Sequence, residues 1–164
     1  MMRGIRRKEK AIESKDEVIA IIKKAKYITI AMSLDNEPYL ATLSHGYDDE
    51  NYCIYFHCAY EGKKIDILKK NNIVWGQALD DEGYVVGSCD HLYATAQFRG
   101  RVVFLKDKKE KRRALEVMIH ALEPNPAKVI EEQITESSLK RVNIGRIDIE
   151  YMSGKKAKEV VISL

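Results

Sequence analysis

Three apolar segments follow one another between residues 27 and 58 with no helix-length stretch between them. The segments "YITIAMS", "YLATLSHGY" and "YCIYFHC" are rich in β-branched and aromatic residues, and only the polar stretches "LDNEP" and "DDEN" separate them. This pattern is typical of short strands joined by tight turns. A doubly wound sheet needs a helix between successive strands, so this stretch argues against that architecture and predicts an antiparallel meander.

Three further segments have strand character: "IVWGQAL", "YATAQFRGRVVFL" and "VNIGRIDIEYM". Gly100 inside the second of them predicts a bulge or a bend, and "DDEGYVVGSCD" before it is interpreted as a loop. About six strands with consecutive early pairing favour a mainly β fold, a small barrel with peripheral helices.

Three or four helices complete the predicted fold. Ser14 and Asp107 each stand three residues before a glutamate, the capping-box spacing that begins a helix. The stretch "GKKIDILKKNN" predicts a short helix with Ile65 and Leu68 facing inward, and another helical segment follows "EPNP".

Composition limits the class of protein. The chain has 164 residues and a net charge of +3 from 28 basic and 25 acidic residues, which suits one domain over 1–164 with a basic N-terminal arm at about 1–13. This charge balance predicts no nucleic-acid partner, and no apolar run reaches the ~18 residues of a membrane span. Three cysteines without a CxxC spacing fit a reducing compartment, so we expect a cytoplasmic protein.

A metal site is a weaker interpretation of the histidines and cysteines. His57 and Cys58 could join Cys89 and His91, but neighbouring strand residues point to opposite faces, and the paired spacings of structural zinc sites are missing. Cysteine–histidine nucleophilic catalysis meets the same geometric objection. We therefore predict no metal.

Two lysines stand at the predicted start of the helix that follows "IYFHC". Free N–H groups at a helix start favour an anion, and Lys63 and Lys64 directly after Gly62 would add two positive charges to it. On spacing alone, the favoured interpretation is two lysines that simply face solvent.

Taken in order, the motifs resemble the FMN-binding split-barrel superfamily of pyridoxamine 5'-phosphate oxidase, and within it the 5-nitroimidazole-resistance proteins. The resemblance spans nearly the whole chain. The most specific stretch is "EPYLATLSHGYDDENYCIYFHCAYEGKKIDIL", which is similar to the family's paired strands, phosphate-binding turn and helix. The stretches that carry weaker likenesses are "MRGIRRKEKAI", "YATAQFRGRVVFL" with "DKKEKRRALEVMIHAL", and "IDIEYMSGKKAKEV".

The resemblance implies an FMN site at a homodimer interface. The flavin ring would lie against the strand that carries Thr42, Leu43 and Ser44. The end of the next strand, at Phe56, His57 and Cys58, would lie alongside. Lys63 and Lys64 would hold the phosphate, and Thr95 would lie near the cofactor. The implied cofactor-binding residues are Thr42, Leu43, Ser44, Phe56, His57, Cys58, Lys63, Lys64 and Thr95. A lysine in place of the family's usual arginine in the phosphate turn keeps the charge but loses the bidentate fork.

The family likeness implies a flavoprotein that passes electrons to a small electron-poor acceptor, such as a nitroaromatic or a quinone. True pyridoxamine 5'-phosphate oxidases end in a segment that pairs tryptophan with arginines, whereas this chain ends "GKKAKEVVISL" with its only tryptophan at Trp75. That activity is therefore not expected. Two alternatives stay open: a barrel that binds flavin, haem or a deazaflavin without turnover, and, less favoured, a nucleic-acid or regulatory protein that uses the basic arm.

Overall fold

The computed structural model describes residues 4–164, and this part of the chain folds into eight strands and five α-helices. The strands are β1 (Ala11–Ile12), β2 (Ile28–Leu34), β3 (Glu37–Leu43), β4 (Gly46–Asp48), β5 (Cys53–Cys58), β6 (Ile73–Val85), β7 (Asp90–Phe104) and β8 (Asn143–Lys156). The helices are α1 (Lys15–Lys24), α2 (Lys63–Lys70), α3 (Lys108–Leu122), α4 (Pro126–Gln133) and α5 (Glu136–Arg141), and a 3₁₀ turn, Lys8–Lys10, precedes β1.

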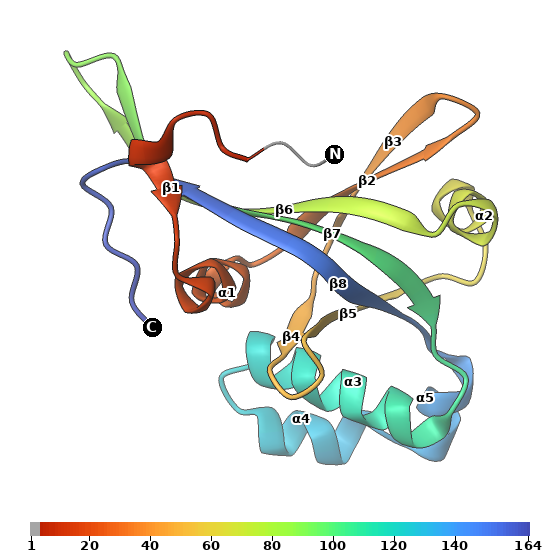
Figure 1. Cartoon of the computed structure of the whole chain (residues 1–164). Helices are drawn as coiled ribbons and strands as arrows, with labels where there is room; N and C mark the ends of the chain where they lie inside the picture. Colours follow the sequence, from red (N-terminus) through yellow and green to blue (C-terminus); the bar gives the residue numbers. More distant parts are fainter. Residues whose placement is uncertain (1–3) are drawn as a thin grey trace.

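The strands form one antiparallel sheet in the order β3-β2-β6-β7-β8-β5-β4, with β1 added on β8. β3 and β4 are consecutive in the chain yet lie at opposite edges of the sheet, so the sheet curls round towards a barrel without closing. Figure 1 shows α3, α4 and α5 gathered beneath β4 and β5, whereas α2 stands beside the β2–β3 hairpin. The predicted mainly β barrel with peripheral helices is confirmed.

Two phenylalanines fill the centre of the barrel, and each lies over a glycine in a neighbouring strand. A Cβ atom on Gly145 would lie 2.2 Å from the ring of Phe56, and one on Gly76 would lie 2.1 Å from the ring of Phe98. Both rings are completely buried. These strand glycines let large rings lie flat across the backbone, which a side chain at either position would prevent.

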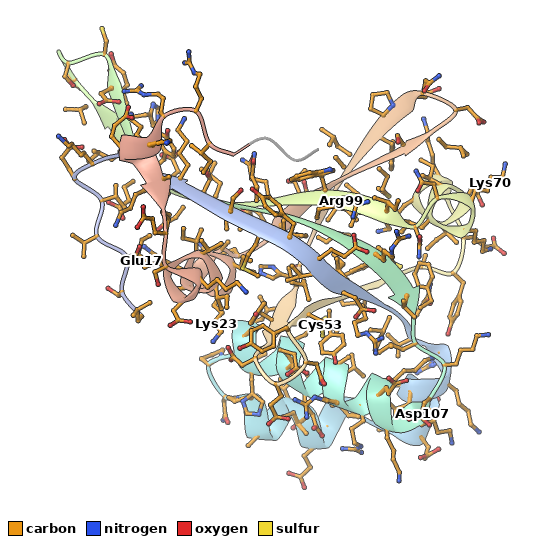
Figure 2. The ribbon with its side chains drawn as sticks, in the orientation of Figure 1. Glu17, Lys23, Cys53, Lys70, Arg99 and Asp107 are labelled. Carbon is orange, nitrogen blue, oxygen red and sulfur yellow. The ribbon has the colours of Figure 1, made fainter. Side chains whose placement is uncertain are left out.

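Both predicted helix starts are confirmed. The Ser14 hydroxyl accepts a hydrogen bond from the Glu17 N–H at 3.4 Å. The Asp107 carboxylate accepts bonds from the N–H groups of Lys109 and Glu110 at the beginning of α3 (Figure 2). A register shift at Gly100 confirms the predicted irregularity in the long strand.

Two predictions about the strands were wrong, and one helix was missed. The segment "YLATLSHGY" is two strands, because β3 ends at Leu43 and β4 begins at Gly46, which leaves Ser44 between them. The predicted loop at 80–90 is mostly paired strand, forming the hairpin of β6 and β7. Ala11 and Ile12, inside the predicted arm at about 1–13, pair with β8, and residues 1–3 of the arm lie outside the described part. The short helix α5 was not predicted.

Candidate functional site

The junction between β5 and α2 leaves the start of a helix uncapped. Gly62 is the N-cap residue with φ +122°, a conformation that favours glycine, and no side chain caps the helix there. Lys63 and Lys64 are the first two helical residues, as predicted. The first-turn N–H groups and two lysines therefore belong to the same helix end, an arrangement that suits an anion.

Within residues 4–164, the two lysines have only weak partners. The ammonium of Lys63 lies 3.0 Å from the carboxylate of Glu37 and 5.0 Å from the ring centroid of Tyr39, both on β3. That ion pair is exposed on both sides, and exposed pairs contribute little free energy. The ammonium of Lys64 lies 5.8 Å from the ring centroid of Phe56. Both lysines can thus turn towards a phosphate at small cost.

The β3 residues predicted to lie against the flavin ring point in different directions. Thr42 is exposed, and its hydroxyl lies 3.1 Å from that of Thr29 on β2. Leu43 is buried in the same core cluster as Phe56. Ser44 is exposed in the connection beyond β3. Of these three residues, only Thr42 and Ser44 present side chains at the surface.

Side chains at the end of β5 alternate between the core and the surface, as strand geometry requires. Phe56 is buried in the core, His57 is exposed, and Cys58 is half-buried beside Asn143, whose amide lies 3.6 Å from the sulfur. Burial raises the pKa of the Cys58 thiol, and the nearby Lys64 ammonium opposes that rise. The exposed imidazole of His57 is therefore the polar side chain that this strand end offers to a ligand.

The start of α2 contacts β3 near the beginning of that strand. Lys63 lies against Glu37 and Tyr39, whereas Thr42 and Leu43 end β3 and Ser44 follows it. Thr95 lies on β7, three strands away from β3 in the sheet. At about 4.8 Å per strand that separation is roughly 14 Å. Its hydroxyl donates to the Lys155 carbonyl oxygen at 3.3 Å.

Glu37 and Tyr39 were missed as site residues. Both belong to a segment whose sequence reads as a turn entering a strand, and nothing local shows that Lys63 packs on them. Their distance along the chain from Lys63 leaves no periodic signal. Only the alternation of β3 could have placed Glu37, Tyr39 and Ala41 on one face.

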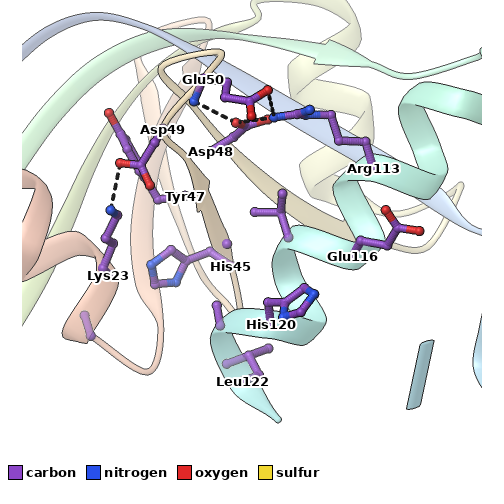
Figure 3. Close-up of a pocket in the computed structure, with 14 residues that line it drawn as sticks. Lys23, His45, Tyr47, Asp48, Asp49, Glu50, Arg113, Glu116, His120 and Leu122 are labelled. Carbon is purple, nitrogen blue, oxygen red and sulfur yellow. Dashed lines mark hydrogen bonds and ion pairs between the residues drawn. The ribbon is translucent and has the colours of Figure 1, made fainter. Parts of the chain in front are cut away.

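A separate cavity of about 510 Å³ lies between the end of α1, β4 and α3, and none of the nine predicted residues lines it. Figure 3 shows its ion pairs, with Lys23 bound to Asp49 and Arg113 bound to Asp48 and Glu50. The Arg113 guanidinium holds the pKa of Asp48 well below its ordinary value. Burial lowers the pKa of His45, whose Nε2 lies 2.7 Å from the Ile22 carbonyl oxygen.

Within residues 4–164, no three histidine, cysteine or acidic side chains gather as a metal site would require. Over the same residues, every helix is too short or too polar to cross a membrane.

Comparison with known proteins extends the geometric description. A family model of pyridoxamine 5'-phosphate oxidase matches residues 14–156. A candidate 5-nitroimidazole antibiotic resistance protein from Bacteroides thetaiotaomicron is 26% identical, with a TM-score of 0.76 over 88% of this chain and 85% of that chain. No curated protein matches the chain.

Two more distant structures share the fold. A flavocytochrome from Azotobacter vinelandii is 14% identical, with a TM-score of 0.77 over 94% of this chain and 72% of that chain. An FAD- and haem-binding protein from Mycobacterium smegmatis is also 14% identical, with a TM-score of 0.75 over 94% of this chain and 76% of that chain. Because the family model spans nearly the whole chain, the protein belongs to the pyridoxamine 5'-phosphate oxidase family of split β-barrels.

Proposed function

We propose that the protein binds FMN where β3, the end of β5 and the start of α2 meet, and that it reduces a small electron-poor acceptor. The observation that carries this proposal is the uncapped start of α2 with Lys63 and Lys64 in its first turn. A phosphate dianion there would offset both charges and accept hydrogen bonds from the free N–H groups. FMN supplies the redox chemistry when bound, and the chain supplies its binding and orientation.

The relatives support a flavin as the ligand class. The two distant structures are a flavocytochrome and a protein that binds FAD and haem. The structure with 26% identity is assigned to resistance against 5-nitroimidazoles, which are electron-poor nitroaromatic compounds. This likeness favours a nitroaromatic or quinone-like acceptor over the substrate in the family's name.

Space for such an acceptor exists beside the proposed ring position. A cavity of about 560 Å³ is bounded by Thr29, which contacts Thr42, by Tyr27 just before β2, and by Gln77 and Leu79 on β6. Its charged lining residues are Lys24, Lys26, Asp80 and Asp81. Tyr27 and Leu79 are large exposed apolar side chains, and Gln77 offers an amide. A small planar molecule with polar substituents matches that combination of surfaces.

The outer face of the sheet is suited to pair with a second copy of the chain. A continuous cross-strand row runs over five strands and carries apolar side chains at most of its positions: Leu40, Ala31, Trp75, Arg99 and Tyr151. Thr42 and Thr95 belong to this same outer face. A homodimer would bury the apolar row and let the partner supply Thr95 to a ring that lies against Thr42.

Replacing Leu40 with lysine is expected to weaken dimerisation about fivefold, because the substitution places a charge in the apolar row of the proposed interface. Leu40 is 64% exposed, so the monomer should fold normally. Sedimentation equilibrium of both proteins measures the change, and Leu164→Lys at the exposed C-terminus serves as control. A monomeric wild-type protein at tens of micromolar would contradict the proposed dimer.

The visible spectrum of the purified protein tests the proposed cofactor. We expect flavin absorption bands, or their appearance after incubation with FMN, and mass spectrometry of the released chromophore should identify it. A flavin-loaded sample should then oxidise NAD(P)H in the presence of a nitroaromatic or quinone. A preparation that stays colourless with FMN would overturn the proposal, and a loaded sample inactive with several acceptors would favour a protein that binds flavin without turnover.

A further inference from the structure

The turn that precedes α2 is fixed by hydrogen bonds with residues that are far away in the sequence. Residues 59–62 are all exposed and belong to no strand or helix. The amide of Asn143, at the start of β8, donates to the Ala59 carbonyl oxygen at 3.0 Å. The hydroxyl of Tyr60 donates to the Val142 carbonyl oxygen at 2.9 Å. Hydrogen bonds rather than apolar packing therefore fix the turn.

A buried lysine completes this arrangement. Lys111 of α3 is only 7% exposed, and its ammonium lies 2.7 Å from the Val142 carbonyl oxygen, 3.2 Å from that of Leu139 and 3.5 Å from the Tyr60 hydroxyl. These three partners are neutral. Val142 and Leu139 belong to the C-terminal end of α5, where carbonyl groups lack helical partners and a cation is favoured. One ammonium thus joins α3, the end of α5 and the turn.

The packing of α2 on the core does not involve this contact with the turn. α2 is held to the core by its own buried side chains, Ile65, Ile67 and Leu68. Tyr60 is half exposed and adds no ring to the core. What the hydrogen bonds determine is the position of the backbone that carries Gly62 and the two lysines.

We propose that Tyr60, Asn143 and Lys111 are positioning residues that preorganise this turn for the phosphate of the cofactor. The inference rests on the proposed function and adds to it the residues that hold the phosphate site. A site fixed before binding loses less conformational freedom when the ligand arrives, so its affinity is higher. None of the three needs to touch the phosphate.

The test is the Tyr60→Phe variant titrated with FMN and with riboflavin, which differ only in the phosphate. Loss of the hydroxyl removes its bonds to Val142 and Lys111 while the ring stays. We expect FMN to bind about fivefold more weakly and riboflavin to bind within about twofold of wild type. Tyr52→Phe is the matched control, since Tyr52 is also exposed and its hydroxyl has no recorded hydrogen bond within residues 4–164.

Quenching of flavin fluorescence gives both dissociation constants, and thermal unfolding shows that the variants remain folded. Equal FMN affinities in Tyr60→Phe and Tyr52→Phe would overturn the positioning role. Equal losses for FMN and riboflavin would overturn it too, because the effect would then not concern the phosphate. If wild-type protein bound neither flavin, the proposed function itself would fail and this inference with it.

Discussion

Replacing Lys63 and Lys64 together with alanine is expected to weaken FMN binding more than tenfold, a loss of at least about 1.4 kcal/mol. The two lysines stand in the first turn of α2, where their ammonium groups lie near an exposed glutamate and two aromatic rings. A phosphate at this point would lose two charge-assisted contacts and keep only the helix N–H groups. Fluorescence titration of the apoprotein with FMN measures the change.

Two comparisons make this result specific. Lys69 and Lys70 stand at the other end of the same helix (Figure 2), so the double alanine variant there changes net charge equally but should bind FMN as wild type does. Riboflavin should bind the Lys63/Lys64 variant nearly as it binds wild type. FMN affinity that survives the loss of both lysines would place the phosphate elsewhere.

A third variant should act in the opposite direction. The Glu37 carboxylate lies 3.0 Å from the Lys63 ammonium and repels a phosphate that approaches the same group. Glu37→Gln is therefore expected to tighten FMN binding about twofold, because the pair it removes is exposed and weak. A gain in FMN affinity for this variant beside a loss for the lysine variant would exclude a general effect on folding.

The sequence predicted those parts of the site that depend on neighbours in the chain. The strand that ends at Cys58, the glycine turn and the helix that begins at Lys63 follow one another within a dozen residues, and each has a local signal. The contacts between elements had no such signal. Asn143 and Val142 hold the turn from more than eighty residues away, and no periodicity reports a partner at that distance.

The errors in the fold have two physical causes. The strand break after Leu43 accompanies close packing of α3, since a Cβ atom on Gly46 would lie 2.8 Å from the Cα of Met118. This contact between β4 and α3 arises from tertiary packing, so the local sequence does not report it. The outer part of the β6–β7 hairpin is polar because much of it lies in solvent, so "DDEG" looks like a loop although its backbone groups pair. Apolar alternation identifies strands only where one face is buried.

Replacing Asp48 with alanine is expected to lower the free energy of unfolding by about 2 kcal/mol, because it removes a buried charged acceptor whose partner Arg113 is itself partly exposed. The side chain of Asp48 is 2% exposed, and its carboxylate accepts bonds from the Arg113 guanidinium at 2.7 and 2.8 Å. It also accepts bonds from Tyr55 and from Asn51. Removing this carboxylate leaves the buried Tyr55 hydroxyl without its acceptor and removes the ion pair that joins β4 to α3.

Urea unfolding measures this loss, and Asp49→Ala is the control. Asp49 is the next residue and also forms an ion pair, with Lys23. Because that pair is exposed, removing the Asp49 carboxylate should cost less than about 0.5 kcal/mol. Because Asp48 lies outside the proposed flavin site, the folded Asp48→Ala protein should bind FMN with unchanged affinity. A stability near that of wild type would mean that solvent replaces the carboxylate at no cost.

The pH dependence of the stability tests whether the charge of Asp48 is the source of this loss. The guanidinium lowers the folded-state pKa of Asp48 below its ordinary value of 3.8, so the pair contributes its full stability above that pH. As pH falls below 3.8 the unfolded chain takes up the proton first, and the contribution is lost progressively towards the folded-state pKa. The stability gap between wild type and Asp48→Ala should therefore narrow as the solution is acidified from pH 5 to pH 2. A gap that stays constant over this range would assign the loss to packing around β4 rather than to the ion pair with Arg113.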